Sequence, residues 1–134
     1  DLSKGTCFEL IRQQITGRFV FLDQDGPGAV PVNYALAGEL IVFRTAAGTH
    51  LRDVLRSPVA FEIDSLDAAE GRGWSVLVRG DAQEVEFDSV PGINSLMDGL
   101  PRPWGEGVHN VWIAITARKV TGRRLQAPYF AAIF

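Results

Sequence analysis

Cysteine is nearly absent from this sequence, because Cys7 is the only one among 134 residues. A single thiol forms neither an internal disulfide nor a cysteine-only zinc site, so the fold depends on its hydrophobic core. No apolar run approaches the roughly 18 residues that a membrane-spanning helix needs, and no charged-then-apolar leader opens the sequence. These absences lead us to expect a cytoplasmic protein without a membrane partner.

An excess of charge of either sign is also missing. Thirteen Lys and Arg residues face 16 Asp and Glu residues, for a net charge of −3, which gives no electrostatic reason to expect a nucleic-acid partner. The length fits one domain, and 46% hydrophobic with 22% charged residues is an ordinary globular balance. We therefore expect a single domain over residues 1–134, with terminal extensions at 1–3 and 126–134.

The motifs of several common enzyme classes are missing as well. The sequence contains no G-x-S-x-G elbow, no Walker loop and no G-x-G-x-x-G. Its two histidines, His50 and His109, are not spaced as metal ligands. Cys7 lies within the first expected helix, where a small core residue is a better interpretation than a nucleophile. We nominate no catalytic residue and no metal ligand, and if the protein is an enzyme, a cofactor must supply the difficult chemistry.

Glycine and proline, in contrast, are frequent, and the segments between them mostly alternate polar and apolar residues. This pattern predicts an α+β fold, mainly antiparallel β, with short helices inserted between the strands of a small barrel. A bulge is expected near Gly80, and the carboxylates of Asp64, Asp67 and Glu70 are expected to form a solvated face. The expected strands are 18–22, 29–37, 40–44, 59–64, 74–87, 110–116 and 120–125, the first three forming a meander, and the expected helices are 2–14, about 49–55 and one that begins at Asp88 or Ser89.

One segment has the composition of a phosphate site. Arg44 ends an expected strand, small residues follow, and a helix begins with Thr49 and His50. The free amides of a helix N-terminus attract phosphate, and the guanidinium of Arg44 is a planar, permanently charged fork. The hydroxyls of Thr45 and Thr49 and the imidazole of His50 can add donors. The alternative is that Thr49 only caps the helix and that Arg44 is a solvated charge at the end of the strand.

A second segment, residues 30–34, contains a proline within an expected strand. Pro31 has no amide hydrogen to donate to a neighbouring strand, so it belongs at an edge or a bulge. An open strand edge at this point would present backbone groups to the rim of a planar heterocycle. In the alternative interpretation, Asn33 satisfies a turn and Tyr34 packs in the core.

Tryptophan supplies a third group of candidates. Trp74 and Ser75 begin a long expected strand, and Trp104 lies in a loop rich in proline and glycine. A tryptophan side chain can cover a flat ligand or a partner subunit. Core packing is the better interpretation for Trp74 and Trp112, whereas Trp104 fits an interface or a ligand contact. The apolar residues 127–134 are expected to dock on their own barrel or on a second subunit.

Taken in order, several segments resemble the pyridoxamine 5′-phosphate oxidase-like flavoproteins, in particular small actinobacterial-type members. The resemblance implies a six-stranded split β-barrel with two or three short helices, assembled as a homodimer with two FMN sites at the subunit interface. The matching segments are CFELI (7–11), GR (17–18), PVNY (31–34), FRTAAGT (43–49), GWSVLVRG (73–80), RPW (102–104) and VTGRR (120–124).

The resemblance also implies the residues that hold the cofactor. Many relatives carry lysine where this chain has His50, which is only partly charged near neutral pH, so phosphate affinity is expected to depend on pH. By this likeness the phosphate contacts are Arg44, Thr45, Gly48, Thr49 and His50, the residues along the isoalloxazine ring are Val32, Asn33 and Tyr34, those beside the ring or the ribityl chain are Trp74 and Ser75, and Trp104 reaches in from the other subunit.

The function that the resemblance implies is an FMN-dependent oxidoreductase acting on a small molecule, with hydride transfer at the flavin N5. Two alternatives remain open. One is a deazaflavin-dependent reductase on the same barrel. The other is a non-catalytic module that binds flavin or haem, in which His50, His109 or Cys7 would ligate the haem iron.

Overall fold

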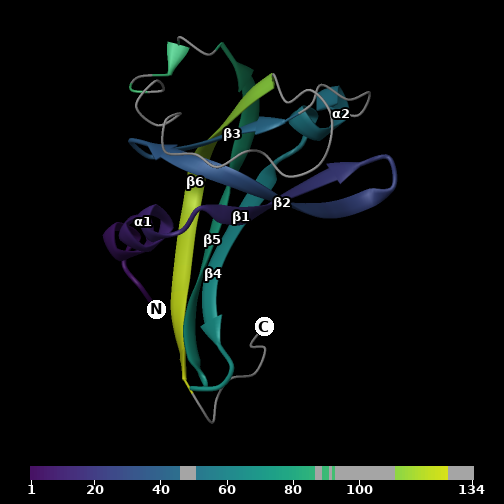
Figure 1. Cartoon of the computed structure of the whole chain (residues 1–134). Helices are drawn as coiled ribbons and strands as arrows, with labels where there is room; N and C mark the ends of the chain where they lie inside the picture. Colours follow the sequence, from purple (N-terminus) through teal and green to yellow (C-terminus); the bar gives the residue numbers. More distant parts are fainter. Residues whose placement is uncertain (46–50, 87–88, 91, 93–110, 127–134) are drawn as a thin grey trace.

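Six antiparallel strands form a closed barrel in a computed structural model that describes residues 1–45, 51–86, 89–90, 92 and 111–126 (Figure 1). Neighbouring strands follow the order β1-β2-β3-β6-β5-β4, so the first three strands form the expected meander. The mainly antiparallel α+β fold is thereby confirmed. The elements are α1 (Lys4–Gln13), β1 (Thr16–Asp23), β2 (Gly26–Ala37), β3 (Leu40–Thr45), α2 (Leu51–Arg56), β4 (Val59–Asp67), β5 (Arg72–Val85) and β6 (Val111–Gln126).

Helix α1 begins where the sequence provides a cap. The side chain of Ser3 accepts a hydrogen bond from the backbone N–H of Thr6 at 3.2 Å, which satisfies one of the free amides of the first turn. The buried face of the helix consists of Cys7, Phe8, Leu10 and Ile11 and packs against β2, β5 and β6. Cys7 is completely buried, so its interpretation as a core residue is confirmed.

Aromatic rings fill the interior of the barrel. The rings of Phe43 and Phe61 lie 6.1 Å apart, and the ring of Tyr34 meets that of Phe61 edge-on at 5.2 Å. Aliphatic side chains from β4, β5 and β6 complete this core, among them Ile63, Val76, Val78, Ile113 and Ile115. Strands β4 and β5 alternate between the core and the outer surface, as the period-two pattern of the sequence predicts, whereas the first five residues of β6 are all buried.

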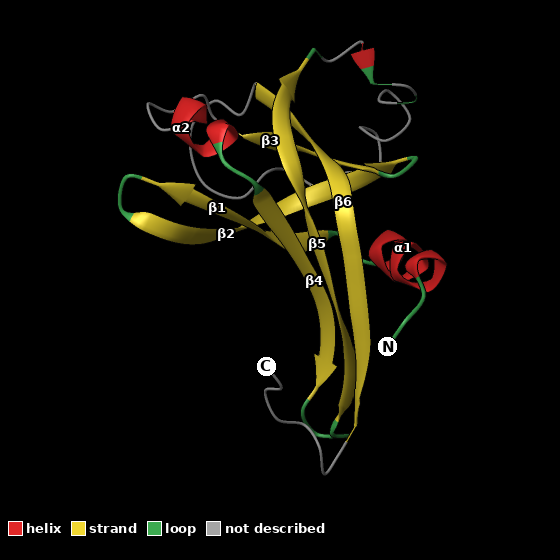
Figure 2. Ribbon diagram, turned by 180° about the vertical axis from the view of Figure 1, so that it is seen from behind, coloured by secondary structure: helices red, strands yellow, loops and turns green. Residues whose placement is uncertain are grey.

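The last two strands that the sequence predicts form a single strand in the structure. The sequence predicts a break between 110–116 and 120–125, but β6 runs continuously from Val111 to Gln126 and pairs with β5 along its whole length. At the expected bulge, Gly80 pairs with Ala117 whereas Arg79 pairs with Lys119, so β6 carries one additional residue, Arg118. The irregular segment therefore bends both strands together and does not end either of them. Beyond the bend, β4, β5 and β6 extend below the barrel as a long ribbon (Figure 2).

Some expectations fall outside the described residues. Helix α2 begins at Leu51, but Thr49 and His50, with which the sequence predicts its start, are not described, and neither are most of the residues after Asp88, including Trp104, or the tail 127–134. Within the described ranges, neither helix has both the length and the hydropathy needed to cross a membrane.

The bend gives a prediction for Gly80. A Cβ at this position would lie 2.0 Å from the backbone oxygen of Thr116, so we expect Gly80→Ala to lower the free energy of unfolding by about 2–3 kcal/mol. Urea denaturation measures the change. Gly5→Ala is the matched control, because no atom lies within 4 Å of its added Cβ and alanine favours a helix. Equal stability of the two variants would contradict this account of the bend.

Candidate functional site

Strand β2 changes its pairing partner halfway along its length. Residues 26–33 pair with β1, and residues 34–37 pair with β3. The N–H of Tyr34 donates to the carbonyl of Ile15 at 2.9 Å, and because successive amides of a strand point in opposite directions, the residues Pro31 and Asn33 face away from β1. In the described part of the chain, no strand pairs with that side of residues 26–33. Pro31 thus lies at an open edge, as the sequence predicts.

An apolar cavity of about 240 Å³ lies where β2 and β3 separate. Two of the predicted site residues, Val32 and Thr45, line it from the two strands, and Leu51 and Val54 line it from α2. The remaining lining residues are Phe19, Phe21, Asp23, Val30, Phe43 and Ile113. Apart from the carboxylate of Asp23 and the hydroxyl of Thr45, the lining side chains are apolar, which suits the uncharged part of a ligand.

Arg44 lies beside Thr45 but on the other face of β3. Its guanidinium carbon is 5.5 Å from the centroid of the Trp112 ring, on the neighbouring strand β6. Trp112 is buried, which confirms its interpretation as a packing residue. A cation–π contact of this kind favours one position of the guanidinium group.

Asn33 and Tyr34 point in opposite directions from β2. The hydroxyl of Thr16 donates to the side-chain oxygen of Asn33 at 2.7 Å, at the outer surface. Tyr34 is buried, and its hydroxyl donates to the carbonyl of Ile11 at 2.5 Å. Burial raises the pKa of Tyr34, so this side chain is a neutral link between α1 and the barrel, and the alternative in which it packs in the core is the one observed.

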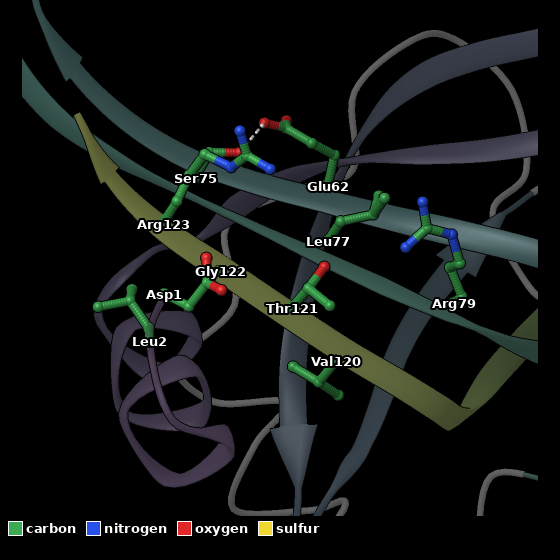
Figure 3. A pocket seen from close by; sticks show the side chains of 10 residues that line it. All are labelled: Asp1, Leu2, Glu62, Ser75, Leu77, Arg79, Val120, Thr121, Gly122 and Arg123. Carbon is green, nitrogen blue, oxygen red and sulfur yellow. Dashed lines mark hydrogen bonds between the residues drawn. The ribbon is translucent and has the colours of Figure 1, made fainter. Parts of the chain in front are cut away.

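Trp74 and Ser75 also face opposite sides of their strand. Trp74 is buried in the core, as expected for packing, whereas Ser75 lines a groove of about 640 Å³ on the outer face of β4, β5 and β6 (Figure 3). The groove is lined by Asp1, Leu2, Glu62, Ser75, Leu77, Arg79, Val120, Thr121, Gly122 and Arg123.

A charged cluster beside this groove is absent from the expectations. Arg18 Nη1 lies 3.0 Å from Glu62 Oε1 and 3.3 Å from Asp64 Oδ2. Burial and the neighbouring Asp64 raise the pKa of Glu62 to about 7, although Arg18 acts in the opposite direction. Asp64 is therefore not part of a solvated face, because its side chain is only 22% exposed and shares Arg18 with Glu62. Glu62 and Asp64 alternate with the buried Phe61 and Ile63, and this alternation could have predicted that both carboxylates lie on one face of the strand. Only the pairing of β1 with β4 shows that they share Arg18.

The strand register places these polar residues on one continuous surface. Asn33 lies opposite Thr16, and Asp64 lies opposite Ser75. Arg18 bridges β1 and β4 between these two pairs. Adjacent strands are about 4.8 Å apart, so Asn33 and Ser75 are separated by roughly 15 Å on the outside of the barrel.

The predicted site residues therefore fall into four groups. Val32 and Thr45 meet at the cavity, Asn33 and Ser75 share the outer surface, and Tyr34 and Trp74 are core residues. Arg44 lies at the outer end of β3, across the open edge from Asn33. Gly48, Thr49, His50 and Trp104 lie outside the described residues.

Comparisons with known proteins match nearly the whole chain. A family described as pyridoxamine 5′-phosphate oxidase matches residues 3–124. The uncharacterised protein Rv0080 of Mycobacterium tuberculosis is 31% identical over 133 residues, which cover 95% of this chain and 86% of that protein. An FAD-binding protein from Mycobacterium smegmatis is 29% identical, with a TM-score of 0.73 over 93% of this chain and 97% of its own. An FAD-binding protein from Mesorhizobium loti, 22% identical, shares the fold with a TM-score of 0.70, over 93% of this chain and 95% of its own.

The raised pKa of Glu62 gives a pH prediction. Its pKa in the folded protein lies above the ordinary value of 4.5, so the stability that the protonated form contributes is lost as the pH rises from about 4.5 through about 7. In Glu62→Gln, which cannot ionise, we expect the free energy of unfolding to rise relative to the wild type by about 1–2 kcal/mol between pH 5 and pH 8, allowing for partial exposure. Urea denaturation at several pH values measures this, with the exposed Glu84→Gln as control. A difference that does not vary with pH would refute the assignment.

Proposed function

Because the chain belongs to the pyridoxamine 5′-phosphate oxidase family, we propose that it binds FMN and acts as an FMN-dependent oxidoreductase on a small molecule. The observation that carries this proposal is the opening between β2 and β3. There the edge of β2 at Pro31, with which none of the described strands pairs, lies beside an apolar cavity and the end of β3 with Arg44 and Thr45.

The opening fits the ring of a flavin. The carbonyl of Pro31 faces this edge of β2, where it can accept a hydrogen bond from the polar rim of an isoalloxazine. Val32 offers an apolar surface beside that edge. Bound FMN would supply hydride transfer at its N5, so the residues of this chain bind and orient the ring and none of them needs to act as a general acid or base in that step.

The end of β3 fits the phosphate. The guanidinium of Arg44, held against Trp112, has the planar donor geometry that phosphate oxygens prefer. The hydroxyl of Thr45 can add a further donor. Gly48, Thr49 and His50 follow directly in the sequence, and we propose that they complete this phosphate site.

We further propose that the protein acts as a homodimer. Ser75 lies about three strand spacings from Asn33 and still farther along the barrel from Arg44, which lies across the open edge beyond Asn33. One chain therefore does not hold Ser75 and Arg44 close to each other. In a dimer, Ser75 and Trp104 of one subunit would lie at the opening of the other subunit, close to its Arg44.

Two observations bear on the choice of cofactor. FAD contains the ring, the ribityl chain and a phosphate of FMN, and a relative of this chain with 29% identity is described as an FAD-binding protein, so FAD is the second candidate cofactor for the same opening. A haem module with Cys7 as iron ligand is disfavoured, because that thiol is completely buried. A deazaflavin cofactor is best tested directly.

The first prediction concerns the cofactor. We expect the purified protein to show flavin absorbance, or to quench the fluorescence of added FMN at micromolar concentration. Titrations with FAD and with a deazaflavin rank the three cofactors, and anaerobic addition of reduced nicotinamide tests whether the bound flavin is reduced. A colourless protein that binds none of them would remove the proposal.

The second prediction concerns Arg44. We expect Arg44→Ala to weaken FMN binding by about 1.5–3 kcal/mol, the range for one lost charge-assisted hydrogen bond, because a phosphate partner is removed. Arg12→Ala, which removes an exposed arginine from α1, is the control and should bind FMN as the wild type does. Fluorescence quenching measures both, and unchanged affinity in Arg44→Ala would mean that the phosphate binds elsewhere.

The third prediction concerns assembly. Sedimentation equilibrium at micromolar concentration should give twice the 14.6 kDa of one chain. A monomeric mass for protein loaded with flavin would contradict the shared site.

A further inference from the structure

The cluster of Arg18, Glu62 and Asp64 contains two carboxylates and one cation. Both carboxylates contact the same guanidinium nitrogen, at 3.0 and 3.3 Å, and their side chains are only 25% and 22% exposed. One guanidinium neutralises one carboxylate, and water screens the second negative charge poorly at this degree of burial. The geometry therefore favours retention of a proton by one of the two carboxyl groups.

Glu62 is the member of this cluster that faces the groove. Its second oxygen accepts a hydrogen bond from the hydroxyl of Ser75 at 3.4 Å, and Figure 3 shows Arg123 directed toward the same place. Arg79 lies at the other end of the groove, with Leu77 between the two arginines. The charged groups around Glu62 are Arg18 on β1, Asp64 on β4, Arg79 on β5, Arg123 on β6 and Asp1 at the rim.

We propose that this groove is an anion site, in which Arg79 and Arg123 attract a phosphate or carboxylate group and Glu62 takes up a proton when that anion binds. The hydroxyls of Ser75 and Thr121 lie along the same wall and can donate to the anion. The anion has two candidate sources, the phosphate of the flavin or an acidic group of the substrate. The proposal rests on the proposed function only in this choice of source.

The proton follows from electrostatics. An anion between the arginines repels an ionised Glu62 but not a neutral one, so binding favours the protonated form. With a pKa of about 7, the group is roughly half protonated at pH 7. If the anion raises the pKa by one further unit, the protein takes up about 0.4 of a proton.

Pyrophosphate is the probe for a test on the full chain. Isothermal titration calorimetry at pH 7 in two buffers with different ionisation enthalpies measures both affinity and proton uptake. We expect millimolar or tighter binding. Because pyrophosphate itself ionises near pH 7, the contribution of Glu62 is the difference between variants: Glu62→Gln should take up about 0.4 proton less than the wild type, and Arg79→Gln should bind pyrophosphate about five- to tenfold more weakly.

Matched variants control for general effects. The exposed Glu84→Gln lies on β5 outside the groove, and Arg12→Gln lies on α1, so both should bind pyrophosphate as the wild type does and with the same proton uptake. Far-ultraviolet circular dichroism establishes that each variant is folded. If Glu62→Gln fails to fold, the comparison of Arg79→Gln with Arg12→Gln still decides whether the groove is an anion site.

Two further titrations identify the source of the anion. If it is the flavin phosphate, FMN binding takes up a proton, riboflavin binding does not, and protein loaded with FMN no longer binds pyrophosphate. If it is a substrate group, protein loaded with FMN still binds pyrophosphate with proton uptake. Either result supports the anion site, and the first would also replace Arg44 as the proposed partner of the flavin phosphate.

Two results would overturn the proposal: no pyrophosphate binding by the wild type, or a proton uptake that Glu62→Gln leaves unchanged. If the protein binds FMN but pyrophosphate binding involves no proton uptake by Glu62, the proposed function remains intact. Conversely, a protein that binds pyrophosphate with proton uptake but binds no flavin would keep the anion site and remove the oxidoreductase.

Discussion

The partner change of β2 is the constraint on which the candidate site depends. The first part of this strand pairs with β1 and the last four residues pair with β3, so none of the described strands pairs with the other edge of residues 26–33. A strand edge normally invites pairing with another chain. Here Pro31 removes one edge-facing donor, which discourages such pairing while leaving its carbonyl acceptor in place. In the proposed function, this edge meets the planar ring of the flavin.

The alternation of strand side chains then distributes neighbouring residues between two surfaces. Val32 lines the cavity while Asn33 bonds Thr16 outside it. Arg44 stacks on the outer face while Thr45 lines the cavity. Consecutive side chains of a strand point to opposite faces. The residues of a short sequence motif on a strand therefore lie in two different environments.

Pairing between distant strands assembles the outer surface. Arg18 comes from β1, whereas Glu62 and Asp64 come from β4 and are more than 40 residues away in sequence. Burial and the neighbouring Asp64 raise the pKa of Glu62 to about 7, although Arg18 acts in the opposite direction. A titratable group of this kind beside a groove is a frequent property of ligand sites, and the family resemblance does not point to it.

The sequence by itself determined the class of fold, the bulge at Gly80, the capped first helix and the family, because these depend on local periodicity, turn residues and short ordered motifs. It did not determine that β6 is continuous, because the additional residue Arg118 interrupts the alternation of apolar and polar residues just as a turn between two strands would. Nor did it determine which residues line a cavity or a groove, since Tyr34 and Trp74 are core residues while Glu62 borders a groove. Only the tertiary structure decided these points, because strand register and barrel closure bring together residues that are not neighbours in the sequence.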